Sequence, residues 1–104
     1  MNKHYYIERP YCRTTTKKEK ALAQMLKAYE YSLVTFSEEF TAKDFQQRLE
    51  NMASEINTIS HGRDLFIRTF DYNGVLSFSF DYKPSKGEAI ASIHLRPVNN
   101  YINH

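Results

Sequence analysis

The chain has 104 residues, of which 41% are hydrophobic and 25% are charged, and its formal net charge is +2. This length is the usual size of one domain, and the composition is typical of a folded chain and excludes general disorder. The apolar runs are too short to cross a membrane, and the first ten residues show no secretion signal. From the length we expect a single domain over residues 1–104. Because one cysteine cannot form an internal disulfide, we expect this domain to be cytoplasmic.

The first 13 residues alternate weakly and interleave tyrosines with cations. Pro10 is tolerated only at strand edges and ends, so this segment is predicted to be an extended arm or an edge strand. Residues 1–20 hold six Lys or Arg against two Glu, whereas residues 28–62 hold two cations against six carboxylates. Phosphates pair with cations and bases stack on aromatic rings. The candidate contacts for an anion or a nucleic acid are Arg9, Tyr11, Arg13, Lys17, Lys18 and Lys20.

The first predicted helix begins after Thr15 or Thr16, because either hydroxyl can cap the exposed backbone N–H groups. Its apolar positions recur at the spacing of one buried helical stripe. These positions are Leu22, Met25, Leu26, Tyr29 and Leu33. The lysines of its first turns are disfavoured by the helix dipole, and they form either a solvated face or part of the anion-facing group.

The second predicted helix begins after Thr41, and Asp44 is placed favourably for the helix dipole. Its buried stripe consists of Phe45, Leu49, Met52, Ile56 and Ile59. Gly62 is expected to end this helix in the left-handed conformation. A short loop over residues 36–40 would make the two helices an antiparallel hairpin.

From residue 65 the apolar period changes from 3.6 to 2. Residues 65–72 and 75–82 are predicted strands, joined through Asn73-Gly74. The length of the loop decides which side chains share a face, because a shift of one residue reverses a strand. We expect a three-residue loop that includes Tyr72. This loop would place on one core face Phe66, Arg68, Phe70, Leu76, Phe78 and Phe80.

A third strand is predicted over residues 88–96, followed by a tail over residues 98–104. Its core face would hold Ala89, Ala91, Ile93 and Leu95, and its outer face would hold Ile90, Ser92, His94 and Arg96. The predicted fold is α+β, with an antiparallel helix hairpin packed on one face of a three-stranded antiparallel sheet. The sheet would have four strands if the N-terminal segment adds an edge strand.

Arg68 is the one charge in the predicted apolar stripe. A buried guanidinium is costly unless it is paired or stacked. We therefore expect either an anion site at Arg68, or a structural role in which it pairs with Glu50 or Glu55 or stacks on Phe78.

The sequence predicts no catalytic, metal or cofactor site. Serine, aspartate and histidine gather on the predicted outer face, but there is no nucleophile elbow and a flat sheet lacks the concavity of an active site. The four histidines show no zinc-ligand spacing, and no glycine-rich phosphate loop occurs. Cys12, beside Arg13, is interpreted as a passive residue and not as a reactive thiol.

Exposed sheet edges and outward apolar side chains favour pairing with another chain. We therefore expect a non-enzymatic interaction or regulatory protein that binds another protein, or a second copy as a homodimer, through its sheet. The candidate interaction surface is Ile67, Tyr72, Ile90, His94 and Arg96. The alternative is a nucleic-acid-binding accessory protein that uses the basic N-terminal arm and the start of the first helix.

Overall fold

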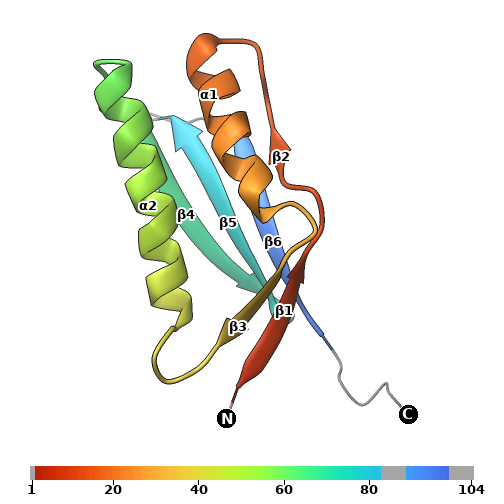
Figure 1. Ribbon diagram of the computed structural model, residues 1–104. Helices are drawn as coiled ribbons and strands as arrows, with labels where there is room; N and C mark the ends of the chain where they lie inside the picture. The colour runs from red at the N-terminus through yellow and green to blue at the C-terminus, as the bar shows by residue number, and fades with distance from the viewer. Residues whose placement is uncertain (1, 83–88, 99–104) are drawn as a thin grey trace.

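The computed structural model describes residues 2–82 and 89–98. Within these residues, both helices lie on the same side of one antiparallel sheet (Figure 1). The elements are β1 (Lys3–Ile7), β2 (Tyr11–Cys12), α1 (Lys17–Leu26), the 3-10 helix η1 (Lys27–Tyr29), β3 (Leu33–Phe36), α2 (Ala42–Ile59), β4 (Leu65–Tyr72), β5 (Val75–Tyr82) and β6 (Ala91–Pro97). The α+β class is therefore confirmed, whereas the predicted number of strands is wrong because the described residues form six.

The sheet order is β3-β1-β6-β5-β4, and β2 pairs with β6 beside β1. The three C-terminal strands form a meander, and the N-terminal segment pairs with the other side of β6. Because β1 lies between β3 and β6, the first residues are an interior strand. They are neither a free arm nor an edge strand, which corrects the prediction.

Pro10 lies in a bulge between β1 and β2. Ile7 is opposite Leu95, and Tyr11 is opposite Ser92. The N-terminal segment therefore advances four residues while β6 advances three, so one extra residue is accommodated. A proline cannot donate to the strand ladder, and a bulge is one of the places where a sheet tolerates it.

The helix starts are confirmed. Thr16 caps α1, because its hydroxyl accepts from the backbone N–H of Glu19 and the Glu19 carboxylate bonds back to the cap. Thr41 and Asp44 form the same reciprocal arrangement at the start of α2. In both helices the capping box satisfies backbone donors that would otherwise lack a partner.

The predicted helix hairpin is wrong because β3 lies between the two helices. α1 ends at Leu26, a short 3-10 helix follows, and Tyr31 adopts a positive φ of 58° that turns the chain. The apolar stripe predicted for the first helix is too long, since Leu33 belongs to a strand and is exposed. Within this strand Val34 and Thr35 are β-branched and Phe36 is aromatic, which is typical of a strand.

The C-terminus of α2 differs from the prediction in one residue. His61, and not Gly62, has the left-handed conformation, with φ of 56°. The N–H of Gly62 donates to the carbonyl of Asn57 at 2.8 Å, and the N–H of His61 donates to that of Thr58 at 3.2 Å. These two bonds are the Schellman pattern, in which the left-handed residue stands one position before the residue that makes the longer bond.

The β4–β5 loop has two residues, so the predicted three-residue loop is wrong. Tyr72 pairs directly with Val75, and both Asn73 and Gly74 have positive φ, of 55° and 84°. Positive φ at both central residues defines a type I′ turn, whose twist matches that of the flanking strands. The turn chemistry therefore set the register, and not the number of apolar side chains on a shared face.

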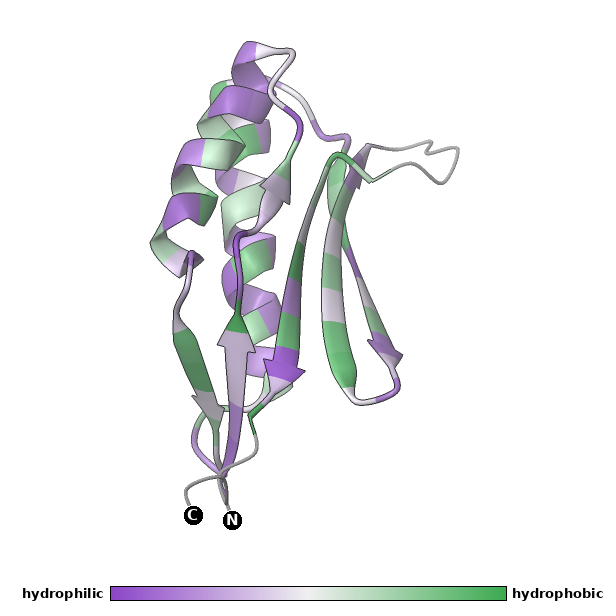
Figure 2. Cartoon of the chain, turned by 90° about the vertical axis from the view of Figure 1, so that its right-hand side faces the viewer, coloured by the Kyte–Doolittle hydropathy of each residue, from purple (hydrophilic) through white to green (hydrophobic). Residues whose placement is uncertain are grey.

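This register turns β4 over relative to the prediction. Leu65 and Ile67 share the helix side of the sheet with Phe78 and Phe80, whereas Phe66, Arg68 and Phe70 lie on the opposite side. Figure 2 shows apolar and polar residues alternating along the strands of the meander. The predicted core positions of β5 are correct, and those of β4 are wrong.

The faces of β6 agree with the prediction over the described residues. Its core side holds Ala91, Ile93 and Leu95, and its other side holds Ser92, His94 and Arg96. Ile90 was predicted to lie on the outer face, but its side chain is buried. It precedes the strand, and its carbonyl accepts a hydrogen bond from the N–H of Arg13. The predicted second turn, Glu88 and residues 99–104 of the tail lie outside the described residues. Neither helix of the described chain has the length and apolarity to cross a membrane.

Candidate protein-binding face

The candidate site is the outer face, by which we mean the side of β4, β5 and β6 that points away from the helices. Its residues are Phe66, Arg68, Phe70, Tyr72, Val75, Ser77, Ser79, Asp81, Ser92, His94 and Arg96. The exposed fraction is 44% for Phe70 and 74% for Tyr72. The outer face therefore presents aromatic rings on a platform of small polar side chains.

Arg68, in the middle of β4, forms an ion pair with Asp81, near the end of β5. The Nε of Arg68 lies 2.7 Å from Oδ2 of Asp81, and its Nη2 lies 3.3 Å from Oδ1. The hydrogen bond that Arg68 donates to Asp81, together with the negative charge of that carboxylate, raises the pKa of Arg68. The guanidinium carbon lies 5.4 Å from the centre of the Phe70 ring, within the range of a cation–π interaction.

The prediction of a buried arginine is therefore wrong. The Arg68 side chain is about half exposed, and the buried group is Asp81. The prediction that Arg68 forms a structural ion pair is correct. Its partner is neither Glu50 nor Glu55, because both of these residues belong to α2 on the other side of the sheet.

His94 lies between two serine hydroxyls on the outer face. Its Nδ1 is 2.8 Å from Oγ of Ser77, and its Nε2 is 3.4 Å from Oγ of Ser92. Burial lowers the pKa of His94, and the charge of Arg96 lowers it further, so its surroundings favour the neutral ring. A catalytic triad needs a carboxylate that orients the histidine. Within the described residues, neither ring nitrogen is hydrogen-bonded to one.

Three of the predicted nucleic-acid contacts are held in ion pairs within the protein. Arg9 pairs with Glu30 at 2.8 Å, Arg13 pairs with Glu19 at 3.0 Å, and Lys18 pairs with Asp64 at 2.8 Å. Among the other predicted contacts, Lys17 and Lys20 are exposed on α1. Tyr11 is opposite Ser92 and is 54% exposed.

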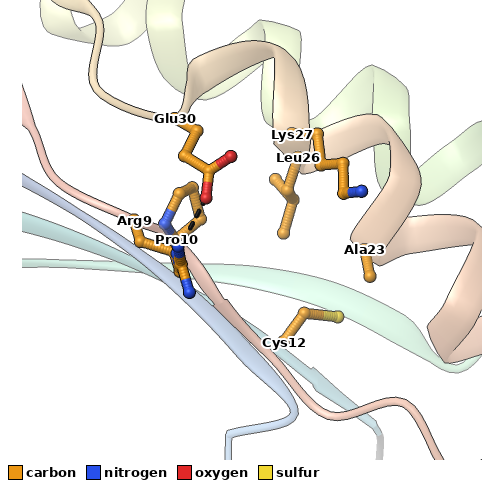
Figure 3. Close-up of a pocket in the computed structure, with 7 residues that line it drawn as sticks. All are labelled: Arg9, Pro10, Cys12, Ala23, Leu26, Lys27 and Glu30. Atoms are coloured by element: carbon orange, nitrogen blue, oxygen red, sulfur yellow. Dashed lines mark ion pairs between the residues drawn. The ribbon is translucent and has the colours of Figure 1, made fainter.

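A hollow of about 380 Å³ lies between the Pro10 bulge and α1. In Figure 3, the ion pair of Arg9 and Glu30 lies at one side of this hollow, and Cys12 lies near Ala23. Burial raises the pKa of the Cys12 thiol to about 11, and the charge of Glu19 acts in the same direction. The thiol is therefore protonated at neutral pH, which makes it a poor nucleophile.

The described part of the chain contains no group of three His, Cys, Asp or Glu residues that could hold a metal ion. No protein-family model, curated protein or solved structure matches the chain. Its function must therefore be argued from the geometry of its own residues.

Part of the outer face was predicted correctly from the sequence. His94 and Arg96 lie on it as expected, and so does Tyr72. Ile67 is half-buried on the helix side, so its proposed role on the outer face is corrected, as is that of Ile90. The aromatic residues Phe66 and Phe70 were missed, although the Asn73-Gly74 pair was the signal that could have revealed them.

Proposed function

We propose that the protein is a non-enzymatic, cytoplasmic interaction protein that binds another protein through its outer face. The observation that carries this proposal is the exposure of Phe70 and Tyr72 beside Arg68. Aromatic residues and arginine are enriched in protein interfaces and contribute many of their strongest contacts.

The energetics of β4 support this proposal. Burying a large apolar side chain is worth about 1.5–3 kcal/mol, and the fold leaves this contribution partly unrealised at Phe70 and Tyr72. A partner that covers these rings would recover it. Asp81 holds Arg68 in place before any partner arrives, which lowers the entropy cost of ordering that side chain on binding.

The nucleic-acid alternative is less favoured, because three of its five cations are already engaged in ion pairs. Phosphates would have to compete with Glu30, Glu19 and Asp64 for Arg9, Arg13 and Lys18. The rings of Phe70 and Tyr72 on the outer face, by contrast, can contact another protein without breaking an ion pair.

Site-specific photo-crosslinking in cells of the native organism tests the proposal. A benzophenone amino acid replaces Tyr72 in one variant and Ile59 in a matched control, because Ile59 is 61% exposed at the end of α2. We expect protein adducts at position 72 in roughly tenfold excess over position 59, and we expect nuclease treatment to leave them unchanged. Equal yields at both positions, or adducts that nuclease removes, would contradict the proposal.

A further inference from the structure

β4 is the last strand of the sheet order and pairs only with β5 within the described residues. Residues in an antiparallel pair alternate between those bonded to the neighbour and those whose backbone groups point away. Tyr72 and Val75 close a two-residue hairpin and are therefore a bonded pair. It follows that Ile67, Thr69 and Asp71 direct their N–H and C=O groups towards the free edge.

The side chain of Asn57 supports this assignment and marks one end of the free edge. Its Oδ1 accepts from the N–H of Leu65 at 3.2 Å, and its Nδ2 donates to the carbonyl of Leu65 at 3.1 Å. The amide thus occupies the place that a seventh strand would take at Leu65. The turn at Asn73-Gly74 marks the other end.

A groove of about 560 Å³ lies along the start of this edge. Its lining includes Glu50, Ala53 and Asn57 from α2, together with Leu65 and Ile67 from β4. Figure 1 shows α2 running alongside β4 on the side that faces away from β5. A single extended strand can enter such a groove, whereas a second folded copy would bring its own α2 against the same space.

The charges along the edge indicate the chemistry of the occupant. Oε2 of half-buried Glu50 accepts from the amide of Gln46 at 3.0 Å, and Oδ1 of Asp71 accepts from the N–H of Gly74 at 3.2 Å. In the described part of the chain, no cation forms an ion pair with either carboxylate. Arg63 lines the groove near the end of α2, whereas Asp71 lies close to the other end of β4, beside the turn.

We propose that the free edge of β4 binds an extended segment of another protein as an added strand. An apolar side chain of that segment lies against Ala53 and Ile67, and a lysine or arginine lies beside Glu50. Backbone hydrogen bonds to Ile67, Thr69 and Asp71 supply affinity, and the groove supplies specificity. This inference rests on the proposed function and names the chemistry of the partner.

A library of random twelve-residue peptides displayed on phage provides the probe. We expect selection of sequences that lack proline, are rich in Val or Ile, and carry Lys or Arg. A synthetic copy of the selected peptide should bind Thr69→Pro at least tenfold more weakly than the wild type, because proline removes the N–H at the centre of the edge. The matched control Thr69→Val keeps that N–H and should bind within roughly twofold of the wild type. Glu50→Gln should weaken the basic peptide about threefold.

Amide hydrogen exchange by NMR tests the same geometry without relying on the proline variant. In the free protein, the amides of Ile67, Thr69 and Asp71 should exchange faster than those of Arg68 and Phe70. The selected peptide should slow the first three and leave the other two nearly unchanged.

Three results would overturn the inference. They are a selection that yields no binder, equal binding to Thr69→Pro and the wild type, and a wild-type dimer that Thr69→Pro dissociates, since the last would make a second copy the occupant. If crosslinking at position 72 succeeds while edge binding fails, the outer face is the contact surface and the edge is not. If the peptide binds the edge but position 72 gives no protein adduct, the outer-face proposal fails and the edge site remains.

Discussion

Among residues 2–82 and 89–98, two carboxylates are almost fully buried, and they differ in how the fold satisfies them. Glu19 and Asp81 are each 1% exposed, and each pairs with an arginine. Glu19 lies on the helix side and also accepts hydrogen bonds from Thr15, Thr16 and Tyr82. Asp81 lies on the outer face, where its ion pair is with Arg68.

The difference separates a structural cluster from a candidate contact. The bonds to Glu19 join the segment after β2, the start of α1 and the end of β5, so the carboxylate links three parts of the fold. Asp81 instead fixes an arginine that is half exposed and lies near the Phe70 ring. The Glu19 carboxylate already accepts its hydrogen bonds inside the fold, so it is not available to a binding partner. The guanidinium of Arg68, by contrast, is half exposed and keeps N–H donors that a partner can reach.

Replacing Glu19 should produce the largest effect. Glu19→Ala removes the ion pair with Arg13 and the acceptor for Thr15 and Tyr82, so we expect a loss of about 3–5 kcal/mol in the free energy of unfolding. Urea unfolding followed by circular dichroism measures this loss. The exposed Glu39→Ala serves as a control and should change stability by less than about 0.5 kcal/mol. A loss below about 1 kcal/mol for Glu19→Ala would remove the structural role of the cluster.

The pH dependence of stability should show an intermediate effect. Burial alone would raise the pKa of Glu19, but hydrogen bonds from Arg13 and Thr15 outweigh it and lower the pKa from 4.5 to about 2. Since the folded state favours the ionised form, this stabilisation is fully present above pH 4.5 and is lost as the pH falls towards 2. With allowance for solvent screening at Arg13, its size is about 2 kcal/mol.

Unfolding of the wild type and of Glu19→Gln across this pH range checks the prediction. The wild type should lose more stability than Glu19→Gln as the pH falls, because the amide cannot be protonated in this range. Parallel curves for the two proteins would show that Glu19 has no lowered pKa in the fold.

Replacing Arg68 should have the smallest effect on folding and a clear effect on binding. Arg68→Ala should lower stability, because it leaves the buried Asp81 carboxylate without its guanidinium partner. The unpaired carboxylate should cost about 1–3 kcal/mol, since water that reaches the Arg68 side solvates it only in part. It should also reduce protein crosslinking at position 72, since Asp81 then orients no guanidinium. Arg68→Lys keeps the charge but loses the two-point geometry and should give an intermediate crosslinking yield. An unchanged yield in Arg68→Ala would exclude this arginine from the contact.

The sequence was most reliable where the determining interactions are local. The caps at Thr16 and Thr41 bond to residues three positions away, so both helix starts could be predicted. The core side of β6 was equally clear, because Ala91, Ile93 and Leu95 alternate with polar residues. The candidate site was predicted only in part. His94 and Arg96 follow from that same alternation, whereas Phe66 and Phe70 were missed because they depend on the register of β4.

The sequence by itself determined the α+β class, both helix starts and the faces of β5 and β6, because short-range periodicity and capping specify them. Only the tertiary structure decided that β1 lies inside the sheet, that β3 separates the helices and that β4 turns Phe66 and Phe70 outward. These features depend on pairing between residues far apart in the chain, or on a turn geometry that overrides the burial of two rings. In β4, the backbone twist of Asn73-Gly74 matched the strands, and the register followed from it.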